Sequence, residues 1–217
     1  MRNAFHDDLD SISLMLINMA ERVSRAMELA TTALLSTNLQ IAEQVISDDS
    51  QIDSIQHDLD AKALNLLARQ QPVAGDLRTI VTSLRMSADI ERMGDLAHHI
   101  AKVARMRYPA AAVPPELAAT VQEMGDVACK IIAKVITVIE TRDIGAALEI
   151  ERDDDEMDKL HRTLFMTLLD DSWQHGIEAA IDITLLGRYY ERCADHAVSV
   201  ARRVYFLVTG KFAPPKE

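Results

Sequence analysis

The stretch ERMGD at residues 91–95 returns as ERCAD at residues 191–195, 100 residues later, and this repeat decides the fold. A second match follows in the same order, because IDSI at residues 52–55 corresponds to MDKL at residues 157–160, 105 residues later. Two matches at nearly one offset indicate a duplicated structural unit. The five-residue difference between the offsets predicts a shorter turn between the last two helices.

Long helices surround both copies of this segment. Aromatic residues make up only 4% of the chain, and 7 Gly and 6 Pro leave few places for turns. Proline and glycine at residues 71–75 end one helix, and the proline-rich stretch at residues 108–116 lies at the midpoint of the chain. Further breaks are expected near residues 36–38, 141–143 and 172–176.

These breaks predict an all-α fold built as two tandem repeats of an antiparallel three-helix bundle, with six long helices. The first repeat should span residues 1–108 and the second residues 109–217. The tail at residues 213–217 is expected to be disordered. Apolar residues of the first helix recur at steps of three and four, which is typical of a bundle seam: Leu9, Ile12, Leu16, Met19, Val23, Ala26, Ala30 and Ala33.

The charge of the chain restricts its partners. With 34 acidic and 23 basic residues the net charge is −11, which disfavours binding to nucleic acid and favours metal cations or basic protein surfaces. No apolar run approaches the roughly 20 residues of a membrane span, and the start of the chain lacks the features of a signal peptide. Cys129 and Cys193 have no metal-site or redox spacing. A reduced, cytoplasmic location is therefore expected.

Four pairs of acidic residues share the spacing i, i+4, which places both members of a pair on one helix face. Like charges at this spacing repel each other, and a bound cation would reverse the repulsion. Two pairs on neighbouring helices of one repeat can converge into a site of four oxygen donors, which suits Mg²⁺, Mn²⁺, iron or Zn²⁺. The pairs are Asp49/Asp53, Glu91/Asp95, Asp154/Asp158 and Glu191/Asp195.

The side chains of these acids are expected to point away from the core. In the third and sixth helices the acids lie nearly opposite the apolar stripe, so we expect them on the outer surface. The first repeat adds His57 and His99 at i+4 from its acids, where the second has Arg162 and Ser199. The other histidines, His98 and His196, are expected at the surface, Cys193 in the core, and Trp173 as a packing anchor.

Two alternatives stay open on pattern alone. The acids can be a solvated face of a plain scaffold, and Arg188 lies three residues before Glu191, where a simple salt bridge can form. A ferritin-like di-metal oxidase is the enzyme alternative, but its Glu-x-x-His motif directed into a helical core does not occur in the chain. No glycine-rich phosphate loop or nucleophile elbow is present either, so nothing indicates an enzyme.

Three segments together resemble the PhoU family of regulators of phosphate uptake. They are QPVAGDLR at residues 71–78, ADIERMGD at residues 88–95 and RYYERCADH at residues 188–196. The resemblance covers nearly the whole chain, and its departures lie in the second repeat. There DSWQHG at residues 171–176 replaces the P-V-x-x-D-L-R turn.

The resemblance implies a pair of three-helix bundles whose acidic pairs hold multinuclear iron or other divalent-metal clusters. It also implies an adaptor, not an enzyme, that restrains phosphate import by the phosphate ABC transporter through its ATPase subunit. The same adaptor would keep the phosphate-sensing histidine kinase inactive when phosphate is plentiful. These partners would hold it at the inner face of the membrane, and we expect it to form a homodimer.

Overall fold

The computed structural model describes residues 2–214, with side chains from residue 5 onward, and it confirms the all-α prediction. Within that range the chain forms six long helices and no strand. Part of the predicted disordered tail, residues 215–217, lies outside the described residues, and residues 213–214 have no regular structure. The elements are α1 (Arg2–Leu35), α2 (Leu39–Gln70), α3 (Ala74–Arg107), the short 3₁₀ helix η1 (Pro115–Leu117), α4 (Ala118–Thr141), α5 (Ile144–Leu168) and α6 (Gly176–Thr209).

Local signals set several of the helix ends. The side chain of Asn38 accepts a hydrogen bond from the backbone N–H of Ile41 at 3.1 Å, which caps the start of α2. Asp143 caps α5 in the same way through the N–H groups of residues 145 and 146. Gly210 ends α6 at a φ of 71°, a left-handed conformation that glycine adopts without strain.

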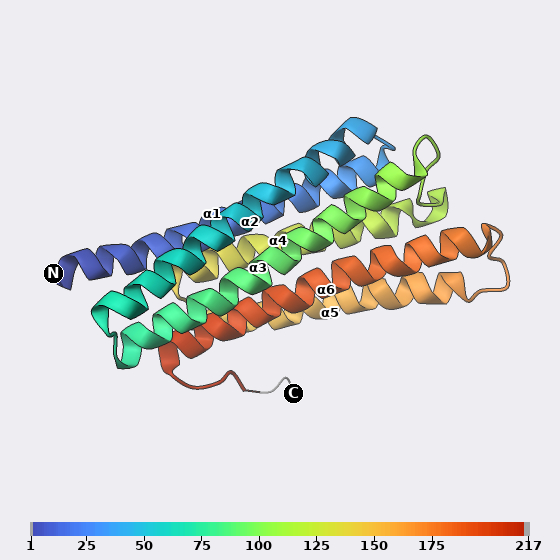
Figure 1. The fold of residues 1–217 in the computed structure, drawn as a ribbon. Helices are drawn as coiled ribbons and strands as arrows, with labels where there is room; N and C mark the ends of the chain where they lie inside the picture. The colour runs from blue at the N-terminus through green and yellow to red at the C-terminus, as the bar shows by residue number, and fades with distance from the viewer. Residues whose placement is uncertain (1, 215–217) are drawn as a thin grey trace.

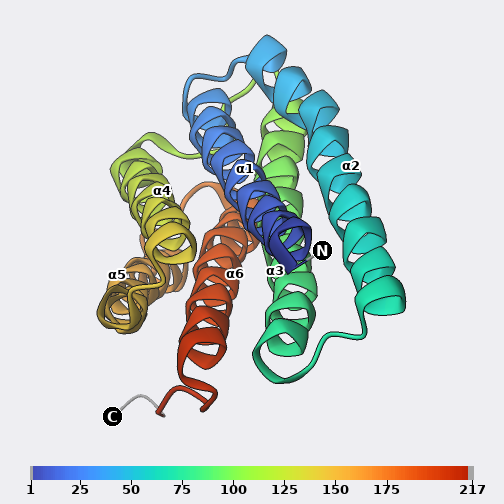
Figure 2. The ribbon, with the colours of Figure 1, turned by 90° about the vertical axis from the view of Figure 1, so that its left-hand side faces the viewer.

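The helices run along one elongated molecule as two three-helix units (Figure 1). Helices α1, α2 and α3 form the first unit, and α4, α5 and α6 form the second. The units meet through α3 against α6 and α1 against α4, so α2 and α5 lie on the two outer sides (Figure 2). The connection between the units is residues 108–117, where the predicted repeat boundary falls.

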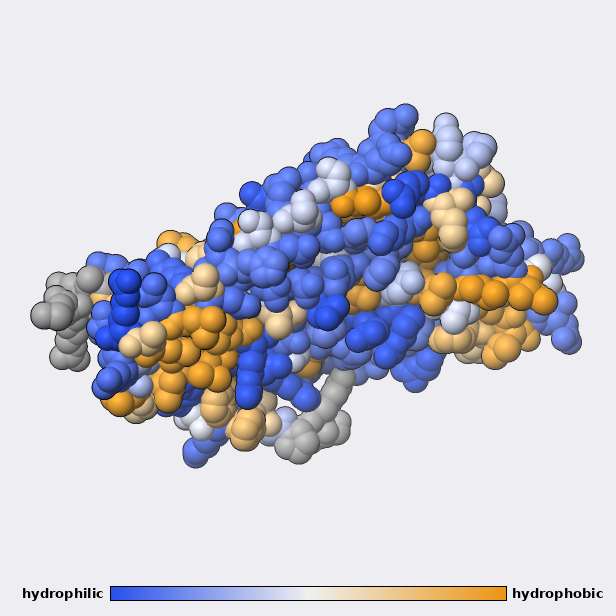
Figure 3. Space-filling view, in the orientation of Figure 1, coloured by the Kyte–Doolittle hydropathy of each residue, from blue (hydrophilic) through white to orange (hydrophobic). Residues whose placement is uncertain are grey.

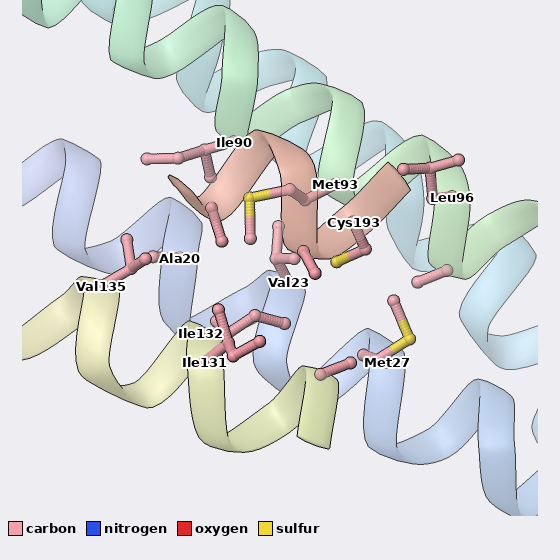
Figure 4. Packing of buried hydrophobic residues seen from close by; sticks show 14 of the residues in the cluster. Ala20, Val23, Met27, Ile90, Met93, Leu96, Ile131, Ile132, Val135 and Cys193 are labelled. Atoms are coloured by element: carbon pink, nitrogen blue, oxygen red, sulfur yellow. The ribbon is translucent and has the colours of Figure 1, made fainter. Parts of the chain in front are cut away.

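One hydrophobic core runs through both units. Figure 4 shows its centre, where Val23 of α1, Met93 of α3, Ile131 of α4 and Cys193 of α6 point toward one another. These side chains are 0–1% exposed, and burying such residues stabilises the fold by about 1.5–3 kcal/mol each. The predicted place of Cys193 in the core is confirmed.

The prediction of a shorter turn between the last two helices is wrong. Helix α5 has 25 residues whereas α2 has 32. The second repeat is therefore shorter in its middle helix and not in the turn that follows. The connection from α5 to α6 is residues 169–175, longer than residues 71–73 between α2 and α3. Trp173 packs against the core in this connection, and its indole N–H donates to the carbonyl of Gly176 at 3.0 Å. None of the helices in the described part of the chain is long and apolar enough to cross a membrane.

Candidate functional site

The first group of predicted site residues joins α2 to α3. The side chains of Asp49, Glu91 and Asp95 are 14%, 19% and 30% exposed, and Asp53 is half-buried. The expectation that these acids face outward is therefore wrong in degree: they lie outside the core but are mostly covered. The reason is that α2 packs beside α3 and covers the face of α3 that a single-helix projection leaves open.

The four carboxylates of this group influence one another. Burial raises the pKa of Glu91, and the nearby carboxylates of Asp95, Asp53 and Asp49 raise it further. Burial likewise raises the pKa of Asp53, with Asp49 and Asp95 adding to the shift. The two pairs are therefore near enough to interact electrostatically across the neighbouring helices.

Basic side chains partly compensate this negative charge. Arg92 lies with its Nε 3.7 Å from Glu91, and its Nη1 donates to Asp95 at 2.8 Å. His98 donates from Nδ1 to the carboxylate of Asp49 across the helices. Its Nε2 is buried and makes no hydrogen bond within residues 2–214. A histidine held by a carboxylate through one ring nitrogen is typical of metal ligands, because the other nitrogen is then oriented.

The second group joins α5 to α6. Burial raises the pKa of Glu191, and the carboxylates of Asp195, Asp158 and Asp154 add to the shift. Only 14% of the Glu191 side chain is exposed, while Asp195 is exposed and the two acids of α5 are half-buried. The same electrostatic interaction between two acidic pairs thus occurs at the equivalent place of the second repeat.

Different bases surround the second group. Arg188 donates from Nη1 to both carboxylate oxygens of Glu191, the salt bridge that the sequence left open. His161 lies one turn after Asp158 on α5, and its Nε2 is buried and makes no hydrogen bond in the described part of the chain. Burial lowers the pKa of His161, and Arg188 lowers it further.

The prediction that His98 and His196 are surface residues is wrong. Their side chains are 18% and 20% exposed, because each points between packed helices to an aspartate. His196 of α6 hydrogen-bonds Asp89 of α3 at 3.1 Å, and Arg203 donates to the same aspartate at 2.7 Å. His99 is exposed and stacks on Tyr189 at 5.3 Å between ring centroids.

A second polar contact between the repeats was not predicted from the sequence. Arg107 of α3 donates through two nitrogens to Asp182 of α6, whose side chain is only 4% exposed. No spacing rule connects residues 75 positions apart, so the sequence carried no signal for this pair. For His98 a signal existed, since it lies three residues after Asp95 on the same helix face.

The donor sets fit metal ions in chemistry but are not preassembled. Among the described residues, no three His, Cys, Asp or Glu side chains are placed close enough to hold a metal ion. Each repeat nevertheless offers four carboxylates, and positive charge would relieve the repulsion that raises the pKa values of Glu91 and Glu191. A cation would have to displace Arg92 and Arg188, which now hold some of these oxygens.

Comparisons with known proteins agree with this architecture. The PhoU domain model matches residues 16–104 and 121–204, one match in each repeat. The Mycobacterium tuberculosis protein named phosphate-specific transport system accessory protein PhoU homolog 2 is 50% identical over 98% of this chain and 100% of its own length. PhoU homolog 1 of Mycobacterium leprae is 49% identical over 98% of this chain and 96% of its own length.

A solved structure gives the same result for the fold. The crystal structure of PhoU from Pseudomonas aeruginosa superposes with a TM-score of 0.87 at 27% identity, covering 95% of this chain and all of that one. Each three-helix unit thus corresponds to one PhoU domain, and the sequence similarity extends over almost the whole length. The chain belongs to the PhoU family.

Proposed function

We propose that this protein is a regulatory adaptor that restrains phosphate uptake and the phosphate-starvation two-component response. Its partners would be the ATPase subunit of the phosphate ABC transporter and the phosphate-sensing histidine kinase. The PhoU family consists of accessory regulatory proteins and is not enzymatic, so the ferritin-like oxidase alternative is set aside. An adaptor acts through its surface, and the surface of this protein supports that role.

The observation that carries the proposal is an apolar surface that occurs twice. In the first repeat Leu77 and Val81 of α3 are exposed, and in the second Ile177 and Ile181 of α6 are exposed at the equivalent positions. Exposed apolar residues cost solubility, and clusters of them mark interaction sites. Their presence at matched positions of both repeats is difficult to explain by a solvated scaffold alone.

The second copy of this surface is the more pronounced. Ile177 is 81% exposed, compared with 41% for Leu77. A groove beside it is lined by residues from the end of α5 and the start of α6, including Leu168, Trp173 and Leu185. Figure 3 shows hydrophobic residues gathered at both ends of one face, over the start of α3 and over the start of α6. One partner with two-fold symmetry, or two separate partners, can bind to the apolar surfaces at these two ends of the molecule.

A binding assay with matched variants tests the docking. Ile177→Asp/Ile181→Asp should abolish capture of the purified ATPase subunit or of the cytoplasmic part of the kinase. Leu14→Asp is the control, because Leu14 is 65% exposed on α1, away from both patches. Capture of neither partner by the parent protein, or equal capture by the parent and the double variant, would contradict the proposal.

We further propose that the two acidic groups bind divalent or trivalent metal ions, with iron, Mn²⁺, Mg²⁺ and Zn²⁺ as candidates. The ligands would be Asp49, Asp53, Glu91 and Asp95 in the first repeat and Asp154, Asp158, Glu191 and Asp195 in the second. His98 can add a nitrogen donor in the first repeat only. The ions would supply positive charge that links two helices, not catalysis.

Elemental analysis of the purified, untagged protein tests this metal proposal. Glu91→Ala/Asp95→Ala should remove the metal of the first repeat, and Glu191→Ala/Asp195→Ala that of the second. Metal that is absent from the parent even after loading, or retained in both variants, would reduce the acids to a solvated face.

We also propose a cytoplasmic homodimer that is held at the inner face of the membrane by its partners. Light scattering after size-exclusion chromatography measures the mass in solution. A mass of one chain across the accessible concentration range would exclude the dimer without affecting the docking proposal.

A further inference from the structure

A cationic pocket lies between α3 and the end of α6, and no residue of the two acidic groups lines it. It has a volume of about 230 Å³, and Phe212 of the segment that follows α6 closes one side. Both repeats contribute to it, because α3 belongs to the first and α6 to the second. The helical residues around it are Thr82, Arg85, Ser199, Arg202, Arg203 and Phe206.

Three arginines line this pocket on a protein whose net charge is −11. Arg203 donates to Asp89 and Arg202 to Glu151, and both use only the Nε–H group for these bonds. Arg85 makes no hydrogen bond or ion pair with any described residue. The pocket therefore retains one unpaired cation and the terminal N–H donors of two more.

Neutral donors and an apolar wall complete the lining. The hydroxyl groups of Thr82 and Ser199 make no hydrogen bond within residues 2–214, although Thr82 is only 4% exposed. Phe206 and Phe212 stack with ring centroids 5.1 Å apart, and the guanidinium of Arg78 lies over the Phe206 ring at 5.8 Å. A ligand would thus meet charged donors on one side and aromatic rings on the other.

The residues at the equivalent positions of the other repeat differ, although Lys102 keeps the positive charge of Arg202. There Leu185 stands in place of Arg85 and Val103 in place of Arg203. Asp182, the counterpart of Thr82, is instead neutralised by Arg107. Two of the three arginines of the lining, Arg85 and Arg203, therefore have no cationic counterpart in the other repeat.

We propose that this pocket binds the phosphoryl group of a compact phosphate compound. Planar guanidinium groups match the tetrahedral oxygens of a phosphoryl group through paired hydrogen bonds, and hydroxyl donors add to them. The volume lies below the roughly 300–1,000 Å³ of pockets for drug-sized ligands. Inorganic phosphate, pyrophosphate, a small phosphate ester or a lipid headgroup shares the required chemistry.

Occupancy of the pocket would connect the two repeats. A phosphoryl group held by Arg85 on one side and by Arg202 and Arg203 on the other bridges α3 to α6. The ligand should therefore raise the melting temperature of the protein, because it binds the folded arrangement and not the unfolded chain. This inference goes beyond the proposed adaptor function and does not depend on docking.

Calorimetric titration of the metal-free protein tests the proposal with inorganic phosphate, pyrophosphate and phenyl phosphate as probes and sulfate as the comparison anion. We expect one saturable site per chain for at least one phosphate probe, with weaker binding of sulfate. Arg85→Ala should lower the affinity about tenfold or more, since it removes a charged donor. It leaves no carboxylate unpaired, so the fold should persist, which circular dichroism verifies.

The matched control is Arg105→Ala, another exposed arginine of α3 without a hydrogen bond or ion pair among the described residues. It should bind like the parent. Co-sedimentation with phosphatidylglycerol vesicles distinguishes a lipid headgroup from a free phosphate compound. If the protein binds vesicles but not the small probes, and Arg85→Ala abolishes the vesicle binding, the ligand is a lipid headgroup. Failure to bind both the small probes and the vesicles, or equal binding by Arg85→Ala and Arg105→Ala, would overturn the proposal.

Discussion

The two repeats keep the same acids but surround them with different bases. In the first, Arg92 lies between Glu91 and Asp95, at 3.7 and 2.8 Å. In the second, Arg188 from the preceding turn holds both oxygens of Glu191. The carboxylates therefore do not owe their positions to one particular salt bridge. The proposed binding of cations requires only the acids, so it is compatible with either arrangement of the bases.

The cores of the repeats differ in a related way. Met93 and Cys193 occupy equivalent positions, as do Ile90 and Tyr190, and all four are fully buried. At one position the first repeat has the larger side chain, Met93 against Cys193, whereas at the other Tyr190 is larger than Ile90 and adds a hydroxyl group. Tyr190 uses that hydroxyl in a hydrogen bond with Thr31 of the first repeat at 2.8 Å.

The largest effect should come from truncating Met93. Met93→Ala should lower the free energy of unfolding by about 3 kcal/mol, because it removes most of a fully buried side chain and leaves a cavity. Cys193→Ala should cost only about 1 kcal/mol, since far less volume is lost. Urea unfolding followed by circular dichroism measures both. Equal losses would show that the equivalent positions contribute equally despite their different size.

Asp89, whose counterpart in the second repeat is Tyr189, should make stability depend on pH. Burial opposes its charge, but hydrogen bonds from His196 and Arg203 hold the pKa of Asp89 below its ordinary value. A carboxyl whose pKa is lowered by folding stabilises the native state above the unfolded pKa of about 3.9, and this stabilisation is lost as the pH falls through the folded pKa.

Asp89→Asn should therefore cost about 2 kcal/mol at neutral pH, the contribution of hydrogen bonds to a charged group. The difference from the parent should shrink in acid, as urea unfolding at a series of pH values would reveal. Asp10→Asn is the control, because Asp10 is exposed and makes no hydrogen bond or ion pair within residues 2–214. A difference that stays constant from neutral pH into acid would exclude the ionic contribution of Asp89.

Removing the hydroxyl of Tyr190 should have a smaller effect. Thr31 donates its own hydroxyl to the carbonyl of Met27 at 3.0 Å, so the Tyr190 hydroxyl is the donor between the two side chains. Tyr190→Phe should lower the unfolding free energy by about 1 kcal/mol, because Thr31 keeps one partner. Differential scanning calorimetry detects the change. An unchanged melting temperature would mean that this bond between the repeats contributes nothing net.

The smallest expected change in stability comes from single substitutions in the two acidic groups. In metal-free protein, Glu91→Gln should stabilise by about 0.3–0.5 kcal/mol at pH 7, because it relieves repulsion among like charges. Glu191→Gln should stabilise less, since Arg188 hydrogen-bonds both oxygens of Glu191, whereas Arg92 approaches Glu91 only to 3.7 Å. The raised pKa of Glu91 means that its native carboxyl takes up a proton first as the pH falls, so the gain should vanish in acid. Urea unfolding of chelator-treated samples at pH 7 and in acid provides the test. Destabilisation by Glu91→Gln would show that the neighbouring bases already compensate the repulsion among the carboxylates.

Most of the fold could be predicted because its determinants are local. The three-and-four spacing around Leu9 to Ala33 and the breaks at residues 71–75 and 108–116 decide where helices begin and end, and the 100-residue offset reveals the duplication. The i, i+4 spacing placed the two acids of each pair on one helix face. The length of the last connection was predicted wrongly, because an offset does not say whether a helix or a turn has lost residues.

The surroundings of the site could not be predicted, because they depend on how the helices pack. A projection of one helix shows that His98 avoids its apolar stripe, but not that α2 covers that side. The cationic pocket combines Arg85 with Arg203, which are far apart in the sequence and meet only through the register of α3 against α6. No periodicity encodes that register.

The continuous core has a consequence for the origin of the molecule. Met93 of the first unit and Cys193 of the second lie in one core that both units share (Figure 4), so a unit on its own would expose an apolar face. A half-length ancestor would have met this requirement by associating with an identical copy, at a strength set by its concentration in the cell. Joining two copies through residues 108–117 makes the same association intramolecular and independent of dilution. It also frees each half to diverge, which a symmetric pair of identical chains could not do.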